Sequence, residues 1–262
     1  MDGIQEVSGS IPLISTKMKD ACPRKGYASF YIRQEGGRPM LFCDLLSTGR
    51  GVTALIGGGG KTTAMYTLAR ELSPRGTVLC CTTTRILPPD HLPVLLSPGE
   101  EAVSAALADH GCACLGTPAE NGKLSAPELP MARLAALADY VLVEADGSRG
   151  LPVKAHLPHE PVIPPEARRT ILLAGASAFF RPAGEAVHRP EQFCRLTGAA
   201  PTDPVRAENL ASLILGEGLG DTIFINQAES GEALREARLL AALLPLPLFA
   251  GALQRGEWTC LS

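Results

Sequence analysis

The sequence GGGGKTT at residues 57–63 contains the residue types that bind the phosphates of a nucleotide. Glycines lack a Cβ, so backbone N–H groups can turn toward phosphate oxygens, and a helix that begins here adds the positive end of its dipole. Lys61 can reach the β- and γ-phosphates, and the Thr62 hydroxyl can coordinate Mg²⁺. The residues predicted to bind ATP or GTP are Gly57, Gly58, Gly59, Gly60, Lys61, Thr62 and Thr63.

The glycine loop is shorter than the common G-x-x-x-x-G-K-[ST] loop, because that pattern requires glycine at position 55 and this chain has Leu55. The shorter G-x-x-G-K-T form also occurs in ATP-dependent ligases of the cell-wall amino-acid-adding type. Ligation or phosphorylation of a small molecule is therefore an alternative function. Lys61 is expected to be exposed in the phosphate cradle and to take part in catalysis.

An apolar run that ends in acids supplies the carboxylates that a magnesium–nucleotide site requires. Residues 140–147 read YVLVEADG, and Glu144 directly follows the apolar run, where the Walker B acid usually stands. We expect Glu144 and Thr62 to hold Mg²⁺. Asp146 projects from the same face if the strand continues, so we expect it at the mouth of the site as a catalytic group. The alternative is that Asp146-Gly147 is only a turn.

Basic residues, histidines and one acid follow this strand end. In an open parallel sheet, the loops beyond the carboxyl ends of the strands gather around the nucleotide. Arginine and lysine there suit an anion, and the histidines and the acid suit a transition metal or proton transfer. An equally simple interpretation is that they hold a proline-rich loop onto the domain. The second-substrate candidates are Arg149, Lys154, His159, Glu160, His188 and Arg189.

Alternating strand-like and helix-like segments position these residues. Strands are predicted at 52–56, 77–83, 112–115, 140–143, 170–174, 222–225 and 246–250. Helices are predicted from 61 to 72 and from 97–100 to 111, and further helices are predicted to start at 125–128, near 203 and near 230. Because continuous apolar strands separated by helices imply a parallel sheet covered on both faces, the predicted fold class is α/β. We expect a P-loop NTPase-like three-layer fold with a mostly parallel central sheet.

Residues 1–39 show no sustained periodicity and mix Gly, Ser, Pro and Lys. They are predicted to be a poorly ordered N-terminal extension whose deletion leaves the melting temperature almost unchanged. Residues 40–262 are predicted to form a single P-loop α/β domain.

Composition excludes several classes of function. With 24 basic and 27 acidic side chains, a net charge of -3 and 5% aromatic residues, the chain lacks the features of a nucleic-acid binder. No apolar run reaches the ~18 residues of a membrane span, and no secretory signal is evident, so we expect a cytoplasmic protein with no membrane partner. The pair Cys112-x-Cys114 either holds a soft metal or alternates within a short strand.

Together with the glycine loop, three further segments resemble one family: CCTTTR at 80–85, VLVEADGSRGLPVKAHLPHEPVIP at 141–164, and AVHRPE at 186–191. The family is the selenium-dependent hydroxylase accessory proteins of the YqeC type, and the resemblance runs from about Leu41 to the C-terminus. It implies a nucleotide-binding role in installing or handling selenium, or the molybdenum cofactor, for selenium-dependent molybdenum hydroxylases. Together with the glycine loop and the acidic strand end, this makes a Mg²⁺-dependent nucleotide-binding maturation factor, an NTPase, the leading hypothesis. Its partners would be nucleotide and a molybdenum hydroxylase or its selenium and molybdenum cofactor machinery.

The chain departs from the family pattern at residues 227 and 229 and at His156. The late strand of the family commonly ends in an Asn-Lys-x-Asp-like sequence that reads guanine in GTPases, whereas residues 226–229 here read NQAE. This difference favours ATP over GTP. His156 replaces a proline common in the family, so it is the weakest candidate for the second-substrate site.

A further alternative function is that of a scaffold that binds nucleotide without turnover.

Overall fold

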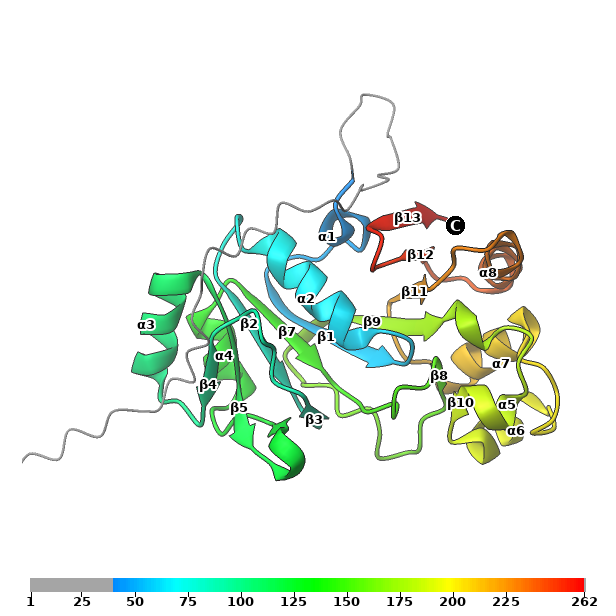
Figure 1. Ribbon diagram of the computed structural model, residues 1–262, viewed down its shortest axis with the longest axis horizontal. Coiled ribbons are helices and arrows are strands. Elements are labelled where there is room, and N and C mark those ends of the chain that lie inside the picture. Colours follow the sequence, from blue (N-terminus) through cyan, green and yellow to red (C-terminus); the bar gives the residue numbers. More distant parts are fainter. Residues whose placement is uncertain (1–39, 262) are drawn as a thin grey trace, which may run out of the picture.

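A mixed sheet with a parallel centre forms the middle of the molecule (Figure 1). The computed structural model describes residues 40–261. Its strands are β1 (Gly51–Gly57), β2 (Val78–Thr82), β3 (Arg85–Ile86), β4 (Val94–Leu96), β5 (Cys112–Pro118), β6 (Leu124–Ser125), β7 (Tyr140–Glu144), β8 (Val153–Lys154), β9 (Ala167–Gly175), β10 (Val187–His188), β11 (Thr222–Asn226), β12 (Leu248–Ala252) and β13 (Glu257–Cys260). Within the described residues, the main sheet has 11 strands in the order β13-β12-β11-β9-β1-β7-β2-β5-β6-β3, with β4 paired to β5, and β8 pairs with β10 separately.

Helices cover both faces of the main sheet. They are α1 (Phe42–Leu45), α2 (Lys61–Leu72), α3 (Glu100–His110), α4 (Met131–Leu137), α5 (Ala183–Ala186), α6 (Pro190–Thr197), α7 (Ala207–Glu217) and α8 (Gly231–Leu243), with short 3-10 turns η1 (Glu120–Gly122) and η2 (Ala176–Ala178). Leu68 of α2 clusters with Leu55 of β1 on one face. Leu210 of α7 and Leu240 of α8 cluster with Ile56 on the opposite face, which α3 and α4 also cover. The predicted three-layer α/β fold is confirmed.

The central position of β1 determines where the site forms. β1 pairs in parallel with β7 on one side and with β9 on the other, and Leu55 of β1 is opposite Glu144 of β7. Because parallel strands end at the same edge of a sheet, the glycine loop at the end of β1 and the acids at the end of β7 are brought together. Six of the seven residues of β1 are buried and Gly51 is partly exposed, as expected for a strand between two helical layers.

Several predicted boundaries agree with the structure. α2 spans Lys61–Leu72, and α8 follows Ser230, whose side chain accepts a hydrogen bond from the Ala233 N–H group as an N-cap does. The prediction that a helix starts at residues 125–128 is wrong, because this helix begins at Met131. Residues 124–125 instead pair with β3 and β5, so strand pairing outweighs the local capping pattern.

The sheet ends in antiparallel strands that the sequence analysis did not predict, namely β13 on one side and β6 and β3 on the other. β13 anchors the start of the described chain, because the Trp258 indole N–H donates to the Met40 carbonyl at 3.0 Å. Phe42 of α1 packs edge-on against Phe224 of β11, with ring centroids 4.8 Å apart, and lies 5.3 Å from the Trp258 ring. The predicted extension, residues 1–39, lies outside the described residues.

The cysteine pair of β5 belongs to the core of the protein. Cys112 and Cys114 alternate within β5 and are buried, so the strand interpretation of this pair is confirmed.

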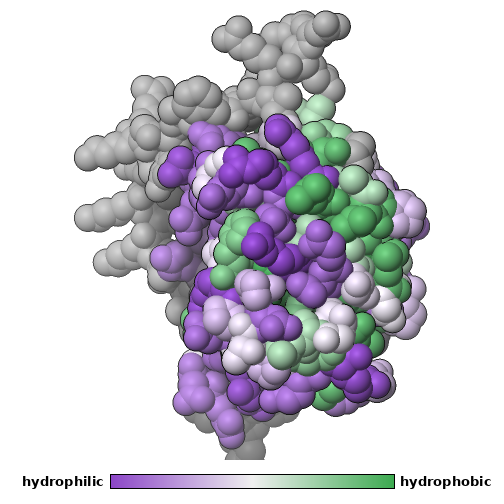
Figure 2. Space-filling model, turned by 90° about the vertical axis from the view of Figure 1, so that its right-hand side faces the viewer, coloured by the Kyte–Doolittle hydropathy of each residue, from purple (hydrophilic) through white to green (hydrophobic). Residues whose placement is uncertain are grey.

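No helix among residues 40–261 is long and apolar enough to cross a membrane. The end of the molecule formed by α5–α8 is largely hydrophilic, with hydrophobic residues gathered along one side (Figure 2).

Phe42, Phe224 and Trp258 form an aromatic cluster, and loss of Phe42 from it is expected to lower the stability of the protein strongly. Because Phe42 is fully buried, Phe42→Ala should lower the free energy of unfolding by about 3–5 kcal/mol in urea denaturation. The control Leu215→Ala removes a half-exposed side chain of α7 and should change it by less than about 0.5 kcal/mol. Equal stability of the two variants would show that α1 is not part of the core.

Candidate functional site

Close backbone packing requires the glycines of the loop between β1 and α2. Gly59 has a φ of +69°, and a Cβ there would lie 2.3 Å from the Gly175 nitrogen. Gly60 has a φ of +119°, and a Cβ there would lie 2.5 Å from the Asn226 side-chain nitrogen. Left-handed backbone and absence of space together leave only glycine at these positions. The N–H groups of Gly57, Gly58 and Gly59 already donate to the Asp146 carboxylate and to the Leu173 and Leu151 carbonyls, so the N–H groups that the loop presents to a ligand are those at the amino end of α2.

Asn226 braces this loop from the end of β11. Its side-chain Nδ2 donates to the Gly59 carbonyl at 2.7 Å, and its Oδ1 accepts from the Leu253 N–H group at 3.0 Å. The side chain is buried, so both hydrogen bonds are protected from water. The sequence analysis considered this residue only as part of the NQAE segment, whereas the structure shows that it contacts the glycine loop. The neighbouring Gln227 accepts a hydrogen bond from the Ser177 hydroxyl at 2.6 Å.

Thr62 and Glu144 meet beside the loop. The Thr62 hydroxyl donates to Glu144 Oε2 at 2.7 Å, which joins the first turn of α2 to the end of β7. Burial raises the pKa of the Glu144 carboxyl, although the nearby charge of Lys61 and the Thr62 hydrogen bond oppose this effect. A hydroxyl and a carboxylate are hard oxygen ligands, which Mg²⁺ prefers together with phosphate oxygens and water. The predicted pair therefore has the donor set and proximity that a Mg²⁺–nucleotide site needs.

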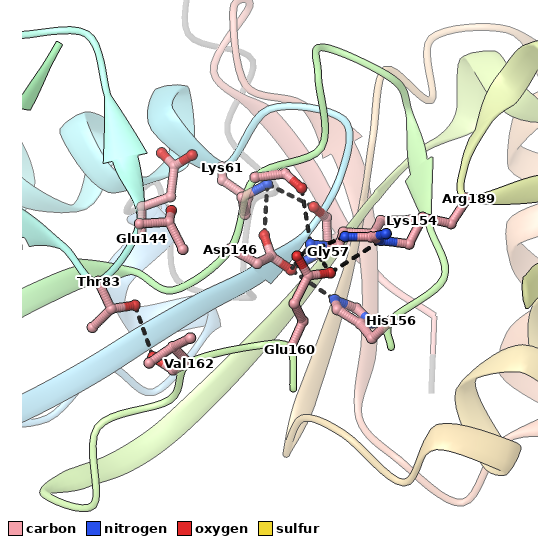
Figure 3. A network of polar contacts seen from close by, with 12 residues as sticks. Gly57, Lys61, Thr83, Glu144, Asp146, Lys154, His156, Glu160, Val162 and Arg189 are labelled. Atoms are coloured by element: carbon pink, nitrogen blue, oxygen red, sulfur yellow. Dashed lines mark hydrogen bonds and ion pairs between the residues drawn. The ribbon is translucent and has the colours of Figure 1, made fainter. Parts of the chain in front are cut away.

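Lys61 is buried, so the prediction of an exposed lysine was wrong. Only 3% of its side chain is accessible, and its Nζ donates to the Gly57 carbonyl at 2.6 Å (Figure 3). The same Nζ lies 2.9 Å from Asp146 Oδ1. This contact is an ion pair without hydrogen-bond alignment, since Oδ1 accepts no hydrogen bond from a described residue. The lysine is folded back onto its own loop by these two groups.

Asp146 is fully buried, so its predicted position at the mouth of the site was also wrong. Its Oδ2 accepts from the Gly57 N–H group at 2.8 Å and lies 2.6 Å from His156 Nε2. Burial raises the pKa of this carboxyl, but the His156 hydrogen bond and the charges of Lys61 and Lys154 together hold it at about 2. Asp146 is therefore an ionised anchor beneath the glycine loop.

His156 bridges two carboxylates. Its Nε2 faces Asp146, and its Nδ1 lies 2.8 Å from Oε2 of Glu217, the last residue of α7. Glu217 also accepts from the His156 backbone N–H group at 2.5 Å. Burial lowers the pKa of His156, but the hydrogen bonds to the two carboxylates raise it above its ordinary value. The sequence analysis ranked His156 lowest and did not select Glu217, which no local pattern marks.

A second layer of ion pairs lies next to this group. Lys154 is buried, and its Nζ contacts Glu160 Oε2 at 3.0 Å and donates to the Gly147 carbonyl at 2.8 Å. Arg189 forms two hydrogen bonds with Glu160, at 2.9 and 3.2 Å (Figure 3). Burial raises the pKa of Glu160, but its bonds to Arg189 and Lys154 lower it overall. These contacts hold the segment after β8 against β10, as the simpler interpretation of these residues expected.

An open cleft of about 840 Å³ extends from the glycine loop. Four of the second-substrate candidates line it, whereas buried Lys154 and exposed His159 do not: the four are Arg149, Glu160, His188 and Arg189. Arg85 and Lys123 also line it, and the sequence analysis did not select them. Burial and the nearby charges of Lys154 and Arg189 lower the pKa of His188. The cleft therefore presents mainly positive charge next to the loop.

The transition-metal interpretation of the histidines was wrong. His159 is exposed and does not line the cleft that His188 lines. Among residues 40–261, no group of three or more histidine, cysteine, aspartate or glutamate side chains is arranged to hold a metal ion. Glu160 is instead committed to its ion pairs with Lys154 and Arg189.

Comparison with known proteins connects this site to one family. A family model described as YqeC protein matches residues 53–191, a range that contains the glycine loop, Glu144, Asp146 and His156. Uncharacterized protein YqeC of Escherichia coli (strain K12) is 32% identical over 210 residues, which cover 73% of this chain and 82% of that protein. The family match ends before Asn226, so the brace from β11 lies beyond it.

The carboxylate-bridged histidine predicts a pH dependence of stability. A group whose pKa is raised on folding stabilises the protein below its ordinary pKa of 6.5, and this contribution is lost as the pH rises through the folded-state pKa. The free energy of unfolding, measured in urea, should therefore decline from about pH 6 to about pH 9 in the wild type. This decline should be smaller in His156→Gln and unchanged in the control His110→Gln, which alters an exposed residue of α3. A decline of equal size in His156→Gln would contradict a charged histidine in the folded protein.

Proposed function

Since the chain belongs to the YqeC family, we propose that it is a Mg²⁺-dependent nucleotide-binding protein, an NTPase, that assists maturation of selenium-dependent molybdenum hydroxylases. The observation that carries the nucleotide part is the 2.7 Å contact between Thr62 and Glu144 at the end of the glycine loop. The pathway part rests on the family resemblance of the sequence. Its partners would be a molybdenum hydroxylase or the selenium and molybdenum cofactor machinery.

The residues present fit a nucleotide and its metal. The backbone N–H groups at the amino end of α2 suit phosphate oxygens, and Lys61 has the length to exchange the Gly57 carbonyl for a phosphate. Thr62 and Glu144 would hold Mg²⁺, which when bound neutralises charge that develops on the phosphates. ATP is preferred over GTP in this proposal, because Gln227 replaces the lysine of the guanine-reading pattern.

Asp146 acts through Lys61 in this proposal. Its carboxylate contacts Lys61 and the Gly57 N–H group, and it does not line the cleft. It is therefore a positioning residue that sets the conformation of the loop and the resting place of the lysine. Loss of this carboxylate should disturb the loop and reduce turnover, whereas the magnesium dependence, which Thr62 and Glu144 would supply, should be kept.

A ligase or kinase reaction is the second candidate, and the cationic part of the cleft favours it. Arg149, Arg189 and Lys123 line the cleft beyond the loop, where a second anion would find charge partners. Analysis of products separates the candidates, because a phosphorylated or ligated small molecule would support this reaction. Nucleotide binding without phosphate release, even with the partner hydroxylase present, would support a non-catalytic scaffold instead.

The buried lysine predicts separate effects on binding and stability. Lys61→Ala should weaken MgATP and MgGTP binding in calorimetric titration by at least about tenfold, or about 1.4 kcal/mol. It should also lower the free energy of unfolding by about 1–3 kcal/mol, because the buried Asp146 loses one of its cations. The double variant Lys61→Met/Asp146→Asn should regain stability without regaining affinity. Unchanged nucleotide binding in folded Lys61→Ala, with Arg168→Met as the surface control, would contradict the phosphate site.

The two acids predict different dependences on magnesium. Glu144→Gln keeps the shape of the side chain and removes its charge, so the increase in nucleotide affinity caused by Mg²⁺ should be lost. Asp146→Asn should retain that increase and reduce phosphate release. Affinity with and without Mg²⁺, measured for both variants, tests the assignment. If Asp146→Asn alone loses the magnesium dependence, the two roles are exchanged.

A further inference from the structure

A second cavity, of about 440 Å³, adjoins the phosphate cleft. We name it the side pocket. Lys123 lines both cavities, and the chain passes from one to the other at the end of β3: Ile86 and Leu87 line the cleft, whereas Pro88 and Pro89 line the side pocket. A molecule in the side pocket would therefore lie next to whatever occupies the cleft.

The wall of the side pocket is mainly apolar. Val94 and Leu124 form its buried part, and they are fixed because β4 and β6 both pair with β5. Leu92, Leu96 and Pro118 also line it. Sites for small organic molecules usually enclose about 300–1,000 Å³ and are lined mostly by apolar side chains with a few polar groups. The side pocket has the size and lining of such a site.

Its two charged residues are arranged unequally. Asp90 lies at the solvent side, since its side chain is 98% exposed and contacts His91 Nδ1 at 3.1 Å. Lys123 lies at the border with the cleft, and no carboxylate within residues 40–261 forms an ion pair with it. Its backbone is held by hydrogen bonds to Ala119 and Glu120, which keeps the residue at the border. An unpaired ammonium group next to an apolar wall selects for a ligand with an apolar body and a negative end.

We propose that the side pocket binds the apolar body of a small organic anion, whose charged end lies against Lys123 at the border with the phosphate cleft. Burial of the apolar body would supply the affinity, and the lysine would supply the preference for an anion. The role of this anion as a second ligand beside the nucleotide rests on the proposed function. Binding of the anion to the side pocket is independent of that function, because neither Lys123 nor the apolar wall belongs to the glycine loop.

The test uses two fluorescent probes in the absence of nucleotide. 1-Anilinonaphthalene-8-sulfonate has an apolar body and a sulfonate, whereas N-phenyl-1-naphthylamine has the same body without the charge. Lys123→Met should weaken sulfonate binding at least about tenfold, or about 1.4 kcal/mol, and leave the neutral probe unchanged. Leu96→Trp, which fills the pocket, should weaken both probes by a similar factor, with Leu92→Trp as a second variant if the first fails to fold. The control Arg168→Met alters an exposed arginine that lines neither cavity and should change neither probe.

Three outcomes would overturn the proposal: no binding of the sulfonate probe, binding unaffected by Lys123→Met and the tryptophan variants, or displacement of the probe by saturating MgATP. Simultaneous binding of probe and MgATP supports adjacent sites. Calorimetric titration of each variant with MgATP keeps the two proposals apart. Failure of the wild type to bind nucleotide contradicts the proposed function, whereas probe binding insensitive to the variants contradicts only the side pocket.

Discussion

The carboxylate of Asp146 is the contact on which the site depends. It accepts the Gly57 N–H group, pairs with Lys61 and hydrogen-bonds His156, which in turn reaches Glu217. Strand β1, helix α2, the segment after β7, the segment after β8 and helix α7 thus converge on one buried group. A buried carboxylate without such partners would be strongly unfavourable, so the loop conformation and the ionised state of Asp146 stabilise each other.

Charges near the loop form two populations with different physical consequences. Lys154 and Glu160 are largely satisfied inside the protein, where they fix the segment between β8 and β10. Arg149 and Lys123 face cavities and form no ion pair with a described carboxylate. Folding removes water from Lys154 and Glu160, and their ion pair offsets the cost of this desolvation. Arg149 and Lys123 remain hydrated and available to ligands. Residue type alone does not separate the two groups, because both contain basic side chains from neighbouring stretches of sequence.

The parts of the site that are contiguous in sequence could be predicted. The glycine loop follows from the backbone freedom of glycine, and the start of α2 follows from the lysine and threonine that come after the loop. The strand before Glu144 follows from its uninterrupted apolar run. The depth of Lys61 and Asp146 could not be predicted, because it depends on His156 and on Glu217, which is 61 residues further along the chain. Likewise, the capping pattern at residues 125–128 gave a wrong helix start, since pairing with β3 and β5 is a tertiary effect. The expected ligands, partners and extent of the domain remain predictions.

The Asn226 brace also bears on how the protein is made. Asn226 lies 167 residues after Gly59, and its other partner, Leu253, is later still. During translation the glycine loop is synthesised long before the strand that braces it. A nascent chain that ends before β11 therefore carries the loop without its final support, and its glycines, which lack conformational preference of their own, sample many backbone states. Acquisition of the folded shape of the glycine loop is in this way a late, long-range event of folding, although the motif itself is entirely local.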